Sequence, residues 1–345
     1  MAIDQQSKQT NTSDELEIED GSYEHFSIII DKKQEPIRID KFLLHRLEKT
    51  SRNRIQNAAK SGSIRVNNKT VKSNYKVRPL DKVSLILPNP EYETELKPEP
   101  IDLNIVFEDD DILVINKQAG LVVHPGVGNW SGTLINGLLH YLPKDKKPGL
   151  AHRIDKNTSG LLVVAKTEYA LSHLAKQFFD HTVNRKYIAL VWGDIESEKG
   201  TITGNIGRDL KQRKQFTVFP DEDYGKHAVT HYKVLKRFGY VTLVECQLET
   251  GRTHQIRVHM KYLGHTLFND EFYGGNKILK GTVYTKYKQF VENCFKILPR
   301  QALHAKTIGF IHPTTEKEML FDSDLPEEFE QVLKKWEVYT SNSMQ

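Results

Sequence analysis

Residues 152–165 read HRIDKNTSGLLVVA, a short polar loop that runs directly into an apolar segment. The run Leu161–Ala165 has the length and the β-branched content of a buried strand. Gly160 stands at the junction, where glycine permits a tight turn that other residues resist. This stretch therefore predicts a strand that carries the carboxylate of Asp155 in the loop at its beginning.

On both sides of this stretch, from residue 101 onward, short β patterns outnumber helical ones. The predicted strands are Ile112–Ile115, Leu121–Val123, Leu161–Ala165, Tyr187–Trp192, Val229–Leu235 and Val241–Leu248, and the predicted helices are Thr133–Leu142, Ala170–Asp180, His254–Leu263 and Glu327–Trp336. Because strands and helices do not alternate regularly, a doubly wound sheet is disfavoured. The pattern predicts an α+β fold over residues 101–338, with a large mixed, mostly antiparallel sheet and with helices and loops flanking a central cleft.

Residues 23–88 predict a separate small domain of helices and short strands. Helical spacing covers Asp40–Leu47, and Ser51 is a suitable N-cap for a second helix that stops at Gly62. The pair Asn67 and Asn68 can close a hairpin, since asparagine tolerates positive φ. Residues 89–100 are rich in Pro and Glu and predict a stiff linker, while the acidic residues 1–22 predict a disordered tail.

Charge is concentrated in this small domain. Residues 37–88 hold 13 Lys and Arg against 3 Asp and Glu, a net charge of +10. Such a segment suits a polyanion, although a solvated basic surface explains the charge alone equally well. The candidate RNA-binding residues are Arg38, Lys41, Arg52, Arg54, Lys60, Arg65 and Lys69.

Three constellations can carry chemistry. Arg153 and Lys156 flank Asp155 and favour its ionised form, and Thr158 and Ser159 can hydrogen-bond the loop backbone to hold the carboxylate in place. The alternative is an Asx-turn that only shapes a loop.

The other two constellations lie further along the chain. Residues 249–259, ETGRTHQIRVH, place Arg252 and His254 at the start of a helix, where an anionic group can bind; a capped, solvated helix is the alternative. Tyr187, in NRKYIALVWG (residues 184–193), can stack on a nucleic-acid base or be a half-buried sheet tyrosine.

Several classes of protein are disfavoured. Cys246 and Cys294 are far apart and outside any C-x-x-C, so a disulfide framework and a cysteine zinc site are unexpected, as is a metal on His254 and His259. No Walker-type G-K-[ST] or dinucleotide fingerprint occurs, and we expect no cofactor. Neither a secretory signal nor a membrane-length apolar run is found, so we expect a cytoplasmic protein without membrane association.

Together these motifs resemble one family, the RluA/RluD-type pseudouridine synthases, over about residues 37–329. His152-Arg153-Ile154-Asp155 with Thr158-Ser159-Gly160 is similar to the family's catalytic loop, with Ile154 in place of the usual Leu. The other matching segments contain Tyr187, Arg257, Asn116-Lys117, residues 300–305, and His124-Pro125-Gly126 with Gly128. The module at 37–88 resembles the alpha-L RNA-binding domain that precedes the catalytic domain in the RluD-like branch.

The resemblance implies roles for these positions. Asp155 would be the catalytic carboxylate, Tyr187 the active-site tyrosine and Arg257 the arginine paired with the aspartate. The residues expected to bind the substrate are His152, Arg153, Thr158, Arg252 and His254. The implied reaction is isomerisation of uridine in RNA, with large-subunit ribosomal RNA as the expected partner. The sequence carries no visible signal for an oligomer, so a monomer is the default expectation.

Alternatives remain at two levels. The carboxylate could attack C1′, attack C6, or abstract a proton to give a glycal. The chain could also be a catalytically silent RNA-binding or ribosome-assembly factor, although such a factor has no need of Asp155, Tyr187 and Arg257 together. A base-releasing hydrolase would instead give free uracil and an abasic product.

Overall fold

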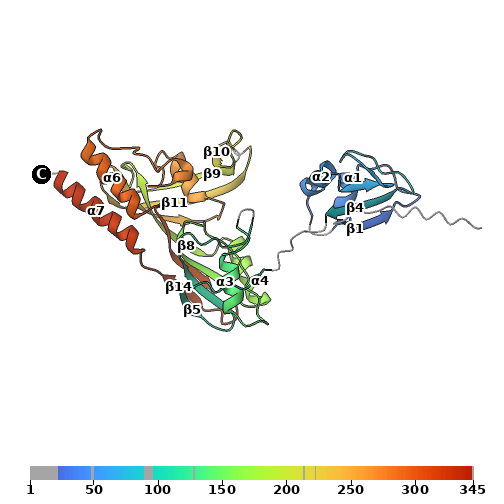
Figure 1. Cartoon of the computed structure of the whole chain (residues 1–345), viewed down its shortest axis with the longest axis horizontal. Coiled ribbons are helices and arrows are strands. Elements are labelled where there is room, and N and C mark those ends of the chain that lie inside the picture. Colours follow the sequence, from blue (N-terminus) through green and yellow to red (C-terminus); the bar gives the residue numbers. More distant parts are fainter. Residues whose placement is uncertain are drawn as a thin grey trace, which may run out of the picture. The chain divides into compact units, whose positions relative to one another are not determined.

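The computed structural model describes residues 22–47, 50–88, 96–126, 129–212, 214–221 and 223–343. The chain divides into two compact units, Met1–Glu95 and Leu96–Gln345 (Figure 1). The predicted tail lies outside the described residues except for Ser22, where the first strand begins, and Gly128 of the resemblance motif also lies outside them.

The N-terminal unit is a four-stranded sheet with two short helices. Its elements are β1 (Ser22–Ile29), α1 (Ile39–Leu44), α2 (Arg52–Lys60), β2 (Ile64–Val66), β3 (Lys69–Thr70) and β4 (Lys82–Pro88), with the sheet order β1-β4-β2-β3. Ser51 caps α2 by accepting from the Arg54 backbone N–H, as its sequence position predicted. Asn67 and Asn68 both have positive φ between β2 and β3. Phe42, Leu43, Ile55 and other buried residues form a core of their own.

The C-terminal unit is built on one ten-stranded sheet. Its strands are β5 (Ile105–Glu108), β6 (Ile112–Lys117), β7 (Ser159–Ala165), β8 (Asn184–Trp192), β9 (Lys199–Arg208), β10 (Phe216–Phe219), β11 (Lys226–Arg237), β12 (Val241–Leu248), β13 (Leu303–Ile311) and β14 (Glu318–Asp322). The order is β10-β9-β11-β12-β8-β13-β7-β6-β5, with β14 beside β13. Every pair of named strands is antiparallel except β13 with β7. The predicted α+β fold with a mixed, mostly antiparallel sheet is thus confirmed.

Helices pack on this sheet at different places. They are α3 (Leu134–Tyr141), α4 (Glu168–Phe179), α5 (Gln255–Tyr262), η1 (Glu271–Tyr273), α6 (Thr285–Ile297) and α7 (Glu327–Ser343). Figure 1 shows α6 and α7 lying together near β8 and β11, whereas α3 and α4 lie near the β5 end. A core around Trp192, Phe268 and Trp336 joins α6 and α7 to the sheet, because large aromatic side chains bury much apolar area.

Several predicted elements differ from the structure. Leu121–Val123 is not a strand, since only an isolated bridge between Val122 and Thr133 forms there. Helix α7 extends to Ser343, beyond the predicted end at Trp336. Helix α6 and strands β1, β5, β9, β10, β13 and β14 were not predicted. Across the described ranges, no helix has the length and apolar character needed to cross a membrane.

Candidate active site

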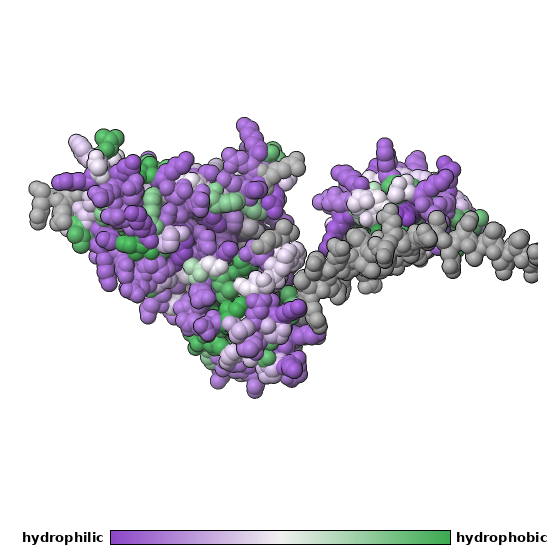
Figure 2. All heavy atoms as spheres, viewed as in Figure 1, coloured by the Kyte–Doolittle hydropathy of each residue, from purple (hydrophilic) through white to green (hydrophobic). Residues whose placement is uncertain are grey.

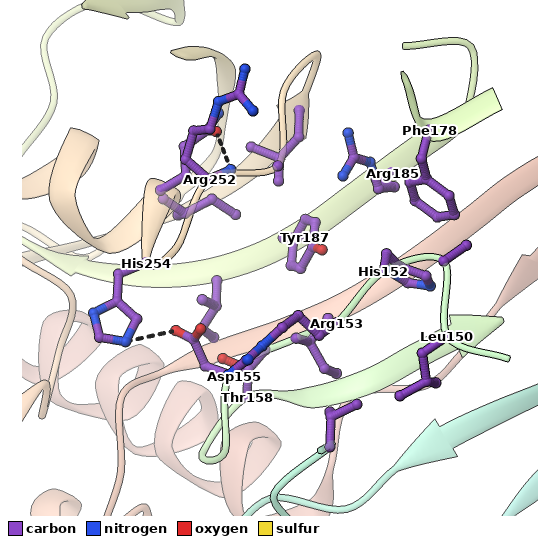
Figure 3. Close-up of a pocket in the computed structure, with 18 of the residues that line it drawn as sticks. Leu150, His152, Arg153, Asp155, Thr158, Phe178, Arg185, Tyr187, Arg252 and His254 are labelled. Carbon is purple, nitrogen blue, oxygen red and sulfur yellow. Dashed lines mark hydrogen bonds and ion pairs between the residues drawn. The ribbon is translucent and has the colours of Figure 1, made fainter. Parts of the chain in front are cut away.

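A cavity of about 690 Å³ opens where β8, the loop before β7 and the start of α5 approach one another. It brings together all eight residues predicted for catalysis and substrate binding, most of them labelled in Figure 3: Asp155, Tyr187, Arg257, His152, Arg153, Thr158, Arg252 and His254. The C-terminal end of α4 also contributes, through Phe178 and Phe179. Segments between residues 123 and 303 in sequence therefore meet around one space.

The loop that carries Asp155 is held in place by hydrogen bonds to its backbone. The Thr158 N–H donates to the Asp155 carbonyl at 3.1 Å, which closes a turn. The ammonium of Lys117 donates to the carbonyls of Lys156, Gln118 and Leu121 at 2.8–3.0 Å. Burial and the positive charge of Arg300 lower the pKa of Lys117 to about 7. This buried side chain ties the loop to the end of β6.

The parallel contact between β7 and β13 fixes the other end of the loop. Gly160 has φ +113°, and a Cβ there would lie 2.2 Å from the Ala305 carbonyl oxygen. Only glycine permits this approach, which agrees with the tight turn predicted from the sequence. Strand β13, which pairs with both β7 and β8, therefore lies directly against the base of the Asp155 loop.

The sequence predicted that the side chains of Thr158 and Ser159 hydrogen-bond the loop backbone. In the structure they bond other partners instead. Thr158 Oγ1 accepts from Gln301 at 3.4 Å, and Ser159 Oγ bonds His304 Nδ1 at 2.9 Å and accepts from Arg300 at 3.2 Å. The prediction was wrong because partners far away in sequence, on the segment leading into β13, are closer than the loop itself. Thr158 lines the cavity but is buried.

Asp155 is held by a chain of charges. Arg257 donates from Nη1 to Asp155 Oδ2 at 3.0 Å, and from Nε and Nη2 to both oxygens of Asp270 at 2.7 and 2.9 Å. Burial opposes the charge of Arg257, but Asp270 and Asp155 outweigh it and raise the pKa of the guanidinium. Asp270 was not predicted from the sequence. It fixes Arg257, and Arg257 in turn fixes one oxygen of Asp155.

His254 approaches the same carboxylate at the outer limit of ion-pair distance (Figure 3). Its Nε2 lies 4.0 Å from Asp155 Oδ2, and its Nδ1 bonds the Tyr273 hydroxyl at 2.8 Å. Burial lowers the pKa of His254, so the ring is neutral at pH 7. The left-handed backbone at His254, φ 57° and ψ 21°, turns the chain into α5 and directs the ring toward Asp155.

Tyr187 and His152 form part of the cavity wall. Tyr187 is buried on β8, and burial raises the pKa of its phenol, so the hydroxyl stays protonated at neutral pH. His152 stacks on Phe178 at 4.4 Å, and its Nε2 accepts from the Val163 N–H at 3.1 Å. Burial and Arg185 lower the pKa of His152 to about 3, so this ring is neutral as well.

Three arginines face the cavity without a carboxylate partner in the described part of the chain. Arg153 is exposed, and Arg252 donates from Nε to the His227 carbonyl at 2.9 Å. Arg185, two residues before Tyr187 on β8, was quoted in a motif but not predicted as a site residue. The signal that could have found it is strand alternation, which points residues two apart to the same face.

The predicted RNA-binding cations of the N-terminal unit have different surroundings. Lys41, Arg52, Arg54, Lys60 and Lys69 are exposed, while Arg38 and Arg65 are half-buried. Arg38 and Arg52 both bond the buried carboxylate of Asp40, at 2.9 and 3.2 Å. Bonds from Arg38 dominate over burial and lower the pKa of Asp40. Some of the hydrogen-bond donors of these two arginines are thus occupied by Asp40 and are not free for RNA.

No cluster of three or more His, Cys, Asp or Glu side chains suited to a metal ion occurs among the described residues. Both cysteines are free and buried, and burial raises the pKa of each thiol to about 12.

Known proteins share this fold and these segments. A family model described as RNA pseudouridylate synthase matches residues 111–262, and the S4 domain model matches residues 37–83. A protein of Chlorobaculum parvum described as an uncharacterized RNA pseudouridine synthase is 46% identical over 89% of this chain and 96% of its own length. The chain therefore belongs to the RNA pseudouridine synthases, a family of isomerases, and the resemblance predicted from its motifs is confirmed.

More distant relatives agree. Ribosomal large subunit pseudouridine synthase D of Zymomonas mobilis is 39% identical over 86% of this chain and 93% of its own length. The solved structure of human RNA pseudouridylate synthase domain containing 1 is 27% identical, covers 66% of this chain and 85% of its own, and superposes with a TM-score of 0.51.

Proposed function

We propose that this enzyme converts uridines of large-subunit ribosomal RNA into pseudouridine, with Asp155 as the catalytic carboxylate. Relatives in Zymomonas mobilis and Nitrosomonas europaea named ribosomal large subunit pseudouridine synthase D, at 39% and 40% identity, support this substrate. The observation that carries the proposal is the partly exposed carboxylate of Asp155, held by Arg257 beside Tyr187 in a cavity. A ribosomal substrate also fits the predicted cytoplasmic location.

The two oxygens of Asp155 have different surroundings. Arg257 bonds Oδ2, and His254 also faces Oδ2 at 4.0 Å. Oδ1 has no hydrogen-bond partner among the described residues, and the side chain is 22% exposed to the cavity. Because a nucleophile or base needs an available lone pair, Oδ1 is the oxygen that acts on the substrate.

The reaction breaks the N1–C1′ bond of uridine and, after the uracil turns, forms a C5–C1′ bond. The C5 proton leaves and N1 gains a proton, so atoms and electrons balance without a donor or an oxidant. Attack of Oδ1 at C1′, its attack at C6, and proton abstraction to a glycal all need the same ionised carboxylate beside the sugar. Arg257 places a fixed positive charge 3.0 Å from this carboxylate and holds it in position.

Tyr187 stacks on the uracil after the nucleotide leaves its helix. Flipping a base costs a few kcal/mol, and stacking on an aromatic ring returns about 1–3 kcal/mol. Since burial raises the pKa of Tyr187, its protonated phenol is a poor base at neutral pH. We expect Tyr187→Phe to retain turnover on this account, whereas a complete loss of turnover would assign the hydroxyl a part in proton transfer.

Arg153 fills the space that the flipped nucleotide leaves. It is the exposed arginine of the catalytic loop, and the structure gives it no partner within the described ranges. A long cationic side chain beside the cavity can replace the lost stacking and contact the backbone phosphates.

The exposed cations of the N-terminal unit dock the RNA. The S4 domain model matches this region, and Figure 2 shows a largely hydrophilic surface on the visible face of the unit. Lys41, Arg54, Lys60 and Lys69 are exposed and have no ion-pair partner among the described residues. Such residues bind phosphates without reading sequence.

The test uses purified protein and an Asp155→Asn variant on transcripts of large-subunit RNA. Pseudouridines are mapped by carbodiimide labelling and reverse-transcription stops. Stops with wild type and none with the variant would establish the substrate and the catalytic carboxylate together. Equal, salt-dependent binding by both proteins without stops would contradict this choice of substrate, and release of free uracil would contradict isomerisation of this RNA.

A further inference from the structure

Arg185 is a buried cation that has no counter-charge among the residues that the structure describes. It is 6% exposed, on strand β8 in the wall of the active-site cavity. Its partners in the described structure are neutral: Nη2 donates to the Glu249 carbonyl at 3.2 Å, and the guanidinium lies 5.3 Å from the centre of the Phe178 ring. Nε is buried and has no hydrogen-bond partner within the described ranges. A buried arginine in this state carries unused donors and an uncompensated charge.

The other buried arginines of the described chain differ. Arg257 bonds Asp155 and Asp270, and Arg300 bonds Glu328 at 2.7 Å. Arg185 alone among these three lacks a carboxylate. An unpaired buried charge lowers the stability of a folded protein by several kcal/mol. An apolar residue at position 185 would therefore be more favourable for folding than Arg185. An anion that is absent from the protein itself would remove this cost.

The position of Arg185 relates it to the flipped base. Arg185 and Tyr187 are two apart on β8, so they point to the same side of the sheet and lie about 6–7 Å apart along the strand. Figure 3 shows Tyr187 between Asp155 and Arg185 in this view. A base stacked on Tyr187 with its sugar at Asp155 would leave its flanking backbone within reach of Arg185.

The loop opposite β8 leaves room for this guanidinium. A Cβ on Gly251 would lie 2.7 Å from Arg185 Nη1, so only a residue without a side chain lets the two approach as they do. The next residue, Arg252, adds a second positive charge, which together with burial lowers the pKa of Arg185. Two like charges face one space with no acid between them among the described residues, which is the arrangement an anion needs.

We propose that Arg185, assisted by Arg252, binds one phosphodiester of the RNA backbone next to the flipped uridine. This inference rests on the proposed RNA substrate. Nη1 of Arg185, which makes no hydrogen bond among the described residues, is the donor that reaches that phosphate, while Nε is enclosed in the wall. The phosphate fixes the strand so that the base reaches Tyr187 and the sugar reaches Oδ1 of Asp155.

The experiment measures binding of a fluorescein-labelled nine-residue oligouridylate by anisotropy, from 50 to 200 mM KCl. For Arg185→Gln we expect a dissociation constant raised about ten- to a hundredfold. We also expect the slope of log affinity against log salt to fall by roughly 0.7, the value for one phosphate contact on a single strand. The control Lys296→Gln removes an exposed charge on α6, outside the cavity, and should change neither quantity.

Uncharged methylphosphonate linkages identify which phosphate of the RNA Arg185 binds. Replacing single phosphates of the oligouridylate by methylphosphonates should weaken wild type at one linkage near the bound base, while Arg185→Gln loses nothing more there. Inorganic phosphate as a competitor at millimolar concentration tests the other source of this chemistry. Displacement of the oligouridylate by phosphate through Arg185 alone, with no sensitive linkage, would assign the site to free phosphate and overturn the proposal.

Gly251→Ala provides a second variant if Arg185→Gln folds poorly. It keeps the arginine but pushes the flexible guanidinium aside, so the same loss of affinity is expected. Wild-type affinity and salt slope in both variants would also overturn the proposal. Failure of the proposed substrate is distinguishable, because wild type would then leave large-subunit transcripts unmodified while the oligouridylate still reported on Arg185.

Discussion

Arg185 and Arg257 line the same cavity and are almost equally buried, at 6% and 5% exposed. Burial alone would lower the pKa of both. That of Arg185 is lowered, whereas Asp270 and Asp155 reverse the effect and raise that of Arg257. Partners, rather than depth of burial, therefore decide the pKa and the role of these two buried arginines. Arg257 is part of a closed network that fixes Asp155, and Arg185 is open to a ligand.

The largest effect is expected when the closed network loses its centre. Arg257→Met leaves Asp270, 1% exposed, with a buried and unpaired charge. We expect the free energy of unfolding in urea to fall by about 3–5 kcal/mol and pseudouridine formation to disappear. The double variant Arg257→Met with Asp270→Asn should recover much of the stability but no turnover. An unchanged urea midpoint in the single variant would contradict the role given to this network.

A smaller loss is expected where the Asp155 loop meets β13. In Gly160→Ala the new Cβ would meet the Ala305 carbonyl, which belongs to a paired strand and cannot move freely. Strained backbone and overpacking together predict a loss of about 2–4 kcal/mol. Gly251→Ala is the matched control, since its Cβ would meet only the mobile end of Arg185. Equal unfolding temperatures for the two variants would show that β13 yields to the new side chain.

Acid is expected to lower the stability of the protein through His304, which hydrogen-bonds Ser159 at the end of the Asp155 loop. Burial, with Arg300 and Lys306 nearby, lowers the pKa of His304 from 6.5 to about 4. The unfolded chain therefore takes up a proton between these values and the folded protein does not, so stability falls as the pH falls from 6.5 toward 4. At pH 4.5 this one residue should account for about 2–3 kcal/mol.

The measurement is the free energy of unfolding between pH 7 and pH 4.5 for wild type, His304→Gln and the exposed His140→Gln. The His304 variant should be less stable at pH 7 and should lose less on acidification, while His140→Gln should follow wild type. Parallel pH curves for all three proteins would mean that the folded protein accepts the proton on His304 without cost.

The sequence predicted best where a pattern is local. Strand β12 was predicted with the bounds Val241–Leu248 that the structure has, because its apolar run is flanked by turn signals. Helix α6 was missed since only Tyr287, Val291 and Cys294 of its 13 residues are buried, and its aromatic and β-branched content gives a weak helical signal. Leu121–Val123 has a strand-like composition but no neighbouring strand to pair with along its length.

The site was predicted only where a sequence motif carries its residues. The resemblance brought Asp155 and Arg257 together across 102 positions, and the structure has them in contact. Asp270 carries no local signal, because nothing in its surrounding residues indicates that it lies behind Arg257. Arg185 resembled an ordinary cation at the beginning of a strand. Its missing partner is a property of the packed wall, which depends on α4, β8 and the loop around Gly251 at once.

The smallest change in stability is expected at Arg185, which has no carboxylate partner among the described residues. Arg185→Met removes a buried charge with no carboxylate partner, and an unbranched apolar side chain fits the space beside Phe178. We expect the free energy of unfolding to stay within about 1 kcal/mol of wild type, or to rise. The same substitution at Arg257 is expected to cost several times more. Similar losses at both positions would mean that the Glu249 carbonyl and the Phe178 ring already satisfy Arg185, and that it belongs to the closed part of the site.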